Sequence, residues 1–62
     1  MEFNVPTMKS SEDGENIKKT ILTSEPNANV TVDTDAKKVT VDGEASAETF
    51  RQLITACGHE VK

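Results

Sequence analysis

Hydrophobic and polar residues alternate at the start of the chain, where single polar residues separate Met1, Phe3 and Val5. A period of two places alternate side chains on opposite faces of a strand, so this segment predicts a strand with one buried face. Pro6 lacks an N–H group to donate to a sheet and is predicted to end the strand.

The next segment predicts an amphipathic helix that begins after a polar loop. Ser10 and Asp13 have the spacing of a helix N-cap and its third residue, in a weaker variant of the capping box. Ile17 and Ile21 lie one turn apart and predict the buried stripe of this helix. Gly14 is expected to be a weak point in its first turn.

Two more alternating runs, 28–32 and 38–41, are separated by a short polar connection, which predicts a β-hairpin. A second helix follows, with Ser46 as its cap and with Gly58 where a left-handed residue commonly ends a helix. Residues 59–62 predict a short closing strand. The buried stripe of the second helix shows the i, i+3, i+4, i+7 spacing and contains Phe50, Leu53, Ile54 and Cys57.

The predicted element order is therefore β-α-β-β-α-β. This order predicts an α+β, ferredoxin-like fold with a four-stranded antiparallel sheet and two helices on one face. A chain of 62 residues is predicted to form one domain, residues 1–62. The predicted core consists of Phe3, Ile17, Ile21, Val30, Val32, Val39, Val41, Phe50, Leu53 and Ile54.

Composition and charge narrow the classes of function. The net charge of −4 and the 3% of aromatic residues argue against a nucleic-acid partner, which needs a basic surface or stacking platforms. No apolar run is long enough to cross a membrane, and the first residues do not have the pattern of a secretion signal. With only one cysteine, no internal disulfide is expected, which fits a reducing compartment, so we predict a cytoplasmic protein. We also expect a monomer.

The residue inventory predicts that the chain is not an enzyme. It has one histidine and one cysteine, and its three glycines are too scattered to form a phosphate-binding loop. Cys57 falls on the apolar stripe of the second helix and is interpreted as a buried core residue. Lys18 and Lys19 lie on the outer side of the first helix, as a solvated face or as a docking site for an acidic partner.

Four segments together resemble the heavy-metal-associated domain family, and more narrowly the small copper chaperones of cyanobacteria. The resemblance covers essentially the whole chain. Its residues are Val5-Pro6-Thr7-Met8 in the first loop, Ala28-Asn29-Val30-Thr31-Val32-Asp33 and Lys37-Lys38-Val39-Thr40-Val41 in the hairpin, and Ala56-Cys57-Gly58-His59-Glu60-Val61 at the end.

The resemblance implies a Cu(I) site at the first loop, where the family carries a Met-x-Cys-x-x-Cys motif. Counted from Met8, the two cysteine positions hold Ser10 and Asp13. The family methionine packs beneath the loop, and His59 stands where the cyanobacterial chaperones have a histidine that reaches the metal. Cu(I) needs soft sulfur ligands, whereas a serine hydroxyl is a poor ligand and a carboxylate is a hard one.

Because the two family cysteines are replaced here, the resemblance implies a metallochaperone-like domain with weakened or altered metal binding and no tightly bound cofactor. Asp13 and His59 are predicted to bind a divalent metal ion weakly at most, and Ser10 is a poor ligand. The implied partner is the soluble metal-binding domain of a metal-transporting ATPase, with Lys18 and Lys19 as docking residues. The alternative is a metal-free protein–protein interaction module of the same fold, in which the three site residues only cap the helix and form ordinary hydrogen bonds.

Overall fold

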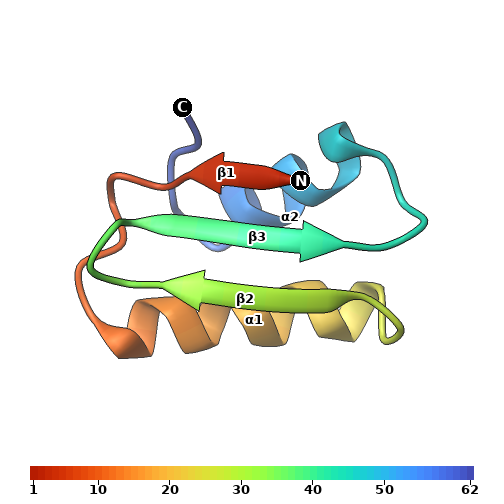
Figure 1. The fold of residues 1–62 in the computed structure, drawn as a ribbon, viewed down its shortest axis with the longest axis horizontal. Helices are drawn as coiled ribbons and strands as arrows, with labels where there is room; N and C mark the ends of the chain where they lie inside the picture. The colour runs from red at the N-terminus through yellow and green to blue at the C-terminus, as the bar shows by residue number, and fades with distance from the viewer.

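The fold consists of a three-stranded antiparallel sheet with two helices packed against one of its faces (Figure 1). The computed structural model describes residues 1–62. The β3 strand lies in the centre of the sheet, with β1 and β2 on either side. The elements are β1 (Glu2–Asn4), α1 (Ser11–Ser24), β2 (Asn29–Asp33), β3 (Lys38–Asp42) and α2 (Ala47–Ala56).

The predicted α+β class is confirmed, but the prediction of a fourth strand is wrong. The C-terminal segment lies beside the end of β1 in Figure 1, and the Lys62 N–H donates to the Asn4 carbonyl at 2.9 Å. The Glu60 N–H, however, donates to the side chain of Thr7. The β1 strand has only three residues, and the Glu60 N–H bonds to a side chain instead of to the β1 backbone. No strand ladder therefore forms between β1 and residues 59–62.

Both helix starts have the predicted caps. The Ser10 hydroxyl accepts from the Asp13 N–H at 3.4 Å, and the Ser46 hydroxyl accepts from the Thr49 N–H at 3.2 Å. At the other end of α2, Gly58 has a φ of 89°, the left-handed conformation that glycine adopts at little cost. The turn after α2 directs the following residues back toward the start of α1.

The core lies between the sheet and the helices and contains nine buried hydrophobic residues: Phe3, Val5, Met8, Ile17, Ile21, Val39, Val41, Phe50 and Ile54. Val30, Val32 and Leu53 were predicted to belong to it but are only half-buried. For the two valines the reason is their place on β2, an edge strand. Cys57 is also half-buried rather than buried, and its thiol donates to the Leu53 carbonyl at 3.4 Å.

Gly14 is a point of close packing rather than a weak point of α1. A Cβ atom added to it would lie 2.6 Å from Cγ1 of Val32 and 3.6 Å from the sulfur of Met8. Glycine thereby lets the first turn of α1 approach β2 and the loop methionine closely.

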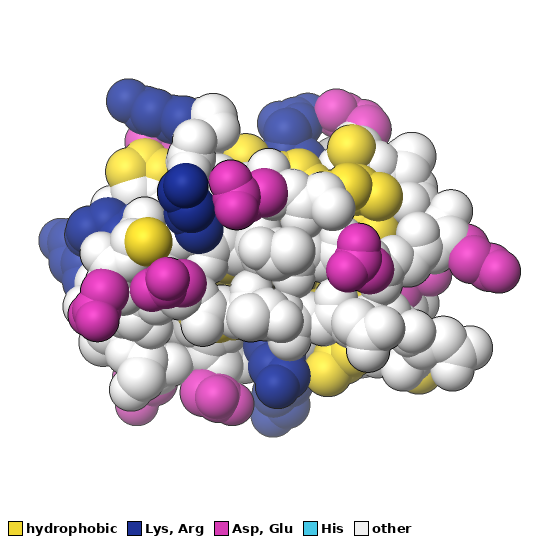
Figure 2. Space-filling view, viewed as in Figure 1, with side chains coloured by type: hydrophobic (Ala, Val, Ile, Leu, Met, Phe, Trp, Pro, Cys, Tyr) yellow, Lys and Arg dark blue, Asp and Glu magenta, His cyan; other side chains and the backbone are white.

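The open face of the sheet is polar. Figure 2 shows uncharged side chains and backbone over the middle of this face, with charged side chains of both signs mostly around it and hydrophobic atoms mainly along the upper edge. On this face Lys38 lies 3.5 Å from the carboxylate of Glu2. Neither helix has the length and apolar character that a membrane span requires.

Candidate functional site

The loop between β1 and α1 rests on a buried methionine and is held in place by a lysine. The Met8 side chain is 0% exposed, and its N–H donates to the Val5 carbonyl at 3.0 Å. The ammonium group of Lys37, in the β2–β3 turn, donates to the carbonyls of Met8 at 3.1 Å and Pro6 at 3.5 Å. Sequence reasoning did not identify Lys37. Its only signal was topological, because the hairpin turn and this loop share one end of the sheet.

The start of α1 is capped on both sides of its first turn. Besides the bond that Ser10 accepts, Oδ2 of Asp13 accepts the Lys9 N–H at 2.9 Å. This bond lowers the pKa of the Asp13 carboxyl below its ordinary value of 3.8; partial burial opposes the shift, while the Ser10 amide and nearby His59 add to it. Asp13 therefore stays a carboxylate at neutral pH.

His59 lies over this helix start, although it comes from the far end of the chain. Its Nε2 atom lies 4.0 Å from Oδ1 of Asp13, and its Nδ1 atom lies 2.9 Å from the Thr7 hydroxyl oxygen. Its side chain is only 13% exposed, compared with 32% for Asp13. The same Thr7 oxygen accepts the Glu60 N–H at 3.1 Å. The structure thus brings Asp13 and His59 together, and it adds Thr7, which sequence reasoning missed.

The donor atoms at this site do not fit Cu(I). No group of three or more His, Cys, Asp or Glu side chains is placed to hold a metal ion. The sulfur of Met8 is buried beneath the loop, and the thiol of Cys57 contacts the carbonyls of Leu53 and Asn16 between the two helices. What remains is one carboxylate oxygen and one imidazole nitrogen, a pair of hard and borderline donors.

Two lysines of α1 place positive charge on the surface of the protein. Lys18 and Lys19 are both exposed, and neither side chain takes part in an ion pair or hydrogen bond within the protein. They lie near the middle of α1, beyond its capped first turn.

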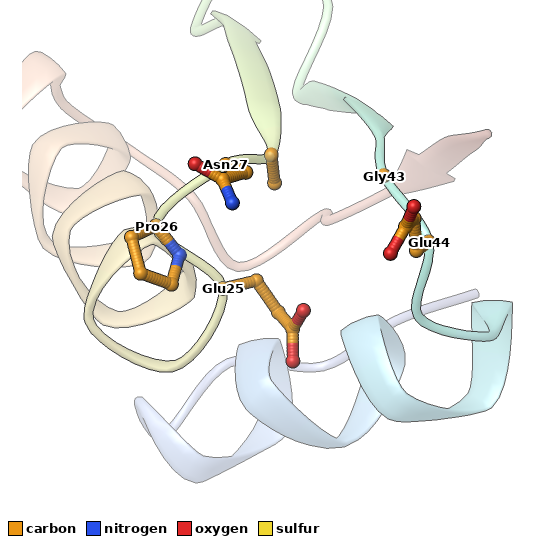
Figure 3. Close-up of a pocket in the computed structure, with 6 residues that line it drawn as sticks. Glu25, Pro26, Asn27, Gly43 and Glu44 are labelled. Carbon is orange, nitrogen blue, oxygen red and sulfur yellow. The ribbon is translucent and has the colours of Figure 1, made fainter.

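A pocket lies at the opposite end of the sheet, between the end of α1 and the end of β3. Glu25, Pro26, Asn27, Ala28, Gly43 and Glu44 line it. Figure 3 shows the carboxylates of Glu25 and Glu44 at its rim, on opposite sides of the opening. A second, open pocket is lined by Asn4, Pro6, Ala36, Lys37 and Lys62, next to the loop.

The chain belongs to the heavy-metal-associated domain family, whose model matches residues 2–60. It is similar to the copper chaperone Atx1 from Synechocystis PCC6803 in its Cu2 form, with 32% identity over 100% of this chain and 98% of that chain and a TM-score of 0.95. A cyanobacterial copper metallochaperone, ScAtx1, is 32% identical over 100% of this chain and 97% of that chain, with a TM-score of 0.82. A gold-binding protein is 30% identical over 100% of this chain and 98% of that chain, with a TM-score of 0.92. Among curated protein sequences, none matches.

These comparisons confirm the predicted family and its likeness to Atx1-type copper chaperones. The chain has a single cysteine, Cys57, so a CxxC pair is absent from it. Ser10 and Asp13, where the resemblance places the cysteines of the family motif, cap the start of α1.

Proposed function

We propose that this protein is a metallochaperone-like domain that does not carry Cu(I) and that retains the surface for docking on a metal-transport partner. The observation that carries the proposal is the start of α1, where Ser10 and Asp13 cap the helix and provide no thiol group. Two oxygen donors cannot replace two thiolates toward a soft cation. Metal binding is therefore weak and of a different kind.

The metal that this site would accept is a divalent cation such as Zn(II), Ni(II) or Cu(II), bound by Asp13 and His59. Oδ1 and Nε2 lie 4.0 Å apart, whereas two ligands on one tetrahedral Zn(II) lie about 3.3 Å apart, so the two side chains would have to move closer together to bind it. Oδ2 is held by the Lys9 amide, which leaves Oδ1 as the free donor. With only two protein ligands, binding is expected to be weak and reversible.

The docking surface in this proposal is the outer side of α1, with Lys18 and Lys19. Their ammonium groups have no partner within the protein, so an acidic surface could pair with them without breaking internal contacts. The soluble metal-binding domain of a metal-transporting ATPase in the cytoplasm is the proposed partner. A metal-free interaction module is the second candidate, favoured by the completeness of the helix cap without any cation.

The same geometry supports a protein that is not an enzyme. His59 contacts Thr7 and lies near Asp13, whereas the Cys57 thiol contacts the carbonyls of Leu53 and Asn16. The Cys57 thiol therefore has no base beside it, and the Thr7 oxygen beside His59 is engaged by the Glu60 N–H.

The proposed loss of Cu(I) binding is tested by competition for Cu(I) with a calibrated chelator. We expect the parent protein to lose its Cu(I) to the chelator, and Ser10→Cys/Asp13→Cys to retain one equivalent. Thiols at a helix N-terminus have a lowered pKa, and the two positions share one side of the first turn. Each single replacement is the matched control and should bind far more weakly. Stoichiometric Cu(I) on the parent refutes the proposal, and a folded double variant that binds no better than the parent favours the interaction module.

The docking part is tested by titrating the labelled protein with the ATPase domain and following amide shifts. Lys18→Glu/Lys19→Glu should weaken binding. Lys38→Glu/Lys62→Glu changes the net charge equally at positions away from α1 and should have a much smaller effect. Equal losses for both variants would mean that overall charge, rather than this surface, determines binding.

A further inference from the structure

We propose that Thr7 is the positioning residue for His59, and that its hydroxyl group serves the imidazole as a donor without metal and as an acceptor when a cation binds. This inference rests on the proposed divalent site. It gives that site a second sphere, which consists of one side chain from the β1–α1 loop and the backbone N–H of Glu60.

The direction of the hydrogen bonds in the metal-free protein follows from what each group is able to do. An amide only donates, so the Glu60 N–H occupies one lone pair of the Thr7 oxygen at 3.1 Å. That oxygen keeps a second lone pair and its own proton, so its 2.9 Å contact with His59 Nδ1 fits either tautomer of the ring. The Asp13 carboxylate, 4.0 Å from Nε2, distinguishes them, because its negative charge favours an N–H over a lone pair on the facing atom. A neutral ring with its proton on Nε2 has an Nδ1 that accepts from the Thr7 hydroxyl group.

A cation at His59 requires the opposite tautomer. Nε2 must offer its lone pair, so the ring proton has to be on Nδ1, and metal-bound histidines generally donate that second N–H to an acceptor. The Thr7 oxygen has a second lone pair and can accept from Nδ1 and from Glu60 together. Since Thr7 is only half-buried, its own hydroxyl proton can turn to water. The same ring orientation therefore persists in both states.

The role of the Thr7 hydroxyl group in positioning His59 is tested with Thr7→Val and Thr7→Ser. Valine keeps the branched shape but removes the hydroxyl group, whereas serine keeps the hydroxyl group. Loss of a second-sphere partner typically lowers metal affinity about 10–100-fold. We expect Thr7→Val to bind Zn(II) more weakly by that factor, and Thr7→Ser to remain within a few-fold of the parent. Thr31→Val, on exposed β2, is the matched control and should bind like the parent.

A metal-free measurement separates this inference from the proposed function. In ¹⁵N spectra of the imidazole, recorded where the ring is neutral, the parent should show a protonated Nε2 and an Nδ1 that accepts a hydrogen bond. Thr7→Val should move the Nδ1 signal to a higher ¹⁵N shift, and Thr7→Ser should not. An unchanged signal in a folded Thr7→Val protein, or a parent protonated at Nδ1, overturns the role of Thr7. A parent that binds no Zn(II) but gives the expected spectra refutes the divalent site alone.

Discussion

Gly14 provides a sharp test of how α1 packs, because its replacement by alanine has opposite effects in the helix and at the helix–sheet contact. In an exposed helix interior, alanine is more favourable than glycine by about 1 kcal/mol. Here the added methyl group would lie 2.6 Å from Cγ1 and 3.5 Å from Cβ of Val32. A β-branched side chain has little rotamer freedom with which to move away, and overpacking typically costs about 1–3 kcal/mol. We therefore expect Gly14→Ala to destabilise the protein by about 1 kcal/mol.

The assay is urea denaturation of four proteins: the parent, Gly14→Ala, Val32→Ala and the double variant. In the Val32→Ala background the 2.6 Å overlap with Cγ1 is gone and the 3.5 Å separation from Cβ is an ordinary van der Waals contact, so Gly14→Ala should become stabilising by about 1 kcal/mol. This change of sign is independent of the cost of Val32→Ala itself. If Gly14→Ala stabilises both backgrounds equally, the first turn of α1 does not contact β2 as described.

Two further predictions concern the hydrophobic core and the stability of the folded protein at acidic pH. Phe50 is 0% exposed, so Phe50→Ala should cost about 3–5 kcal/mol in urea denaturation, and a cost below about 1 kcal/mol would show that the ring lies outside the core. The Lys9 amide lowers the pKa of Asp13 from 3.8, so the stability contributed by its ionisation is present above about pH 4 and is lost as the pH falls through the lowered pKa. The parent should therefore lose more stability than Asp13→Asn on acidification below pH 4, and parallel losses would exclude a role for this carboxylate.

Much of the fold was predictable from local pattern, because the signals involved are local. The period of two in the hairpin and the serine caps before both helices predicted elements that the structure contains. The fourth strand was wrong for a non-local reason. Residues 59–62 alternate no worse than other short strands, but the Glu60 amide bonds to a threonine more than fifty positions away.

Only the part of the site that follows from the topology could be predicted from the sequence. The loop after β1 and the turn after α2 lie at one end of the sheet, so the approach of His59 to Asp13 could be anticipated. Thr7 and Lys37 lie at the same end of the sheet, but threonine and lysine in polar loops are usually solvated, so their residue types did not distinguish them. Their roles depend on side-chain directions that only the folded chain defines.

The charge at the helix start explains why the fold does not need a metal ion there. The N-terminus of a helix favours negative charge, which in the thiolate motif of the family comes from two cysteines and is partly neutralised by one Cu(I). Two thiolates with Cu(I) carry a formal charge of −1, and Ser10 with ionised Asp13 also carries −1. The Lys9 amide lowers the pKa of Asp13, so this charge is present at neutral pH without a metal ion. A partner that responds to charge at this loop would therefore meet, without any metal, the formal charge of a loaded chaperone. A divalent cation bound between Asp13 and His59 would change this formal charge from −1 to +1, so divalent metal should weaken docking on such a partner rather than promote it.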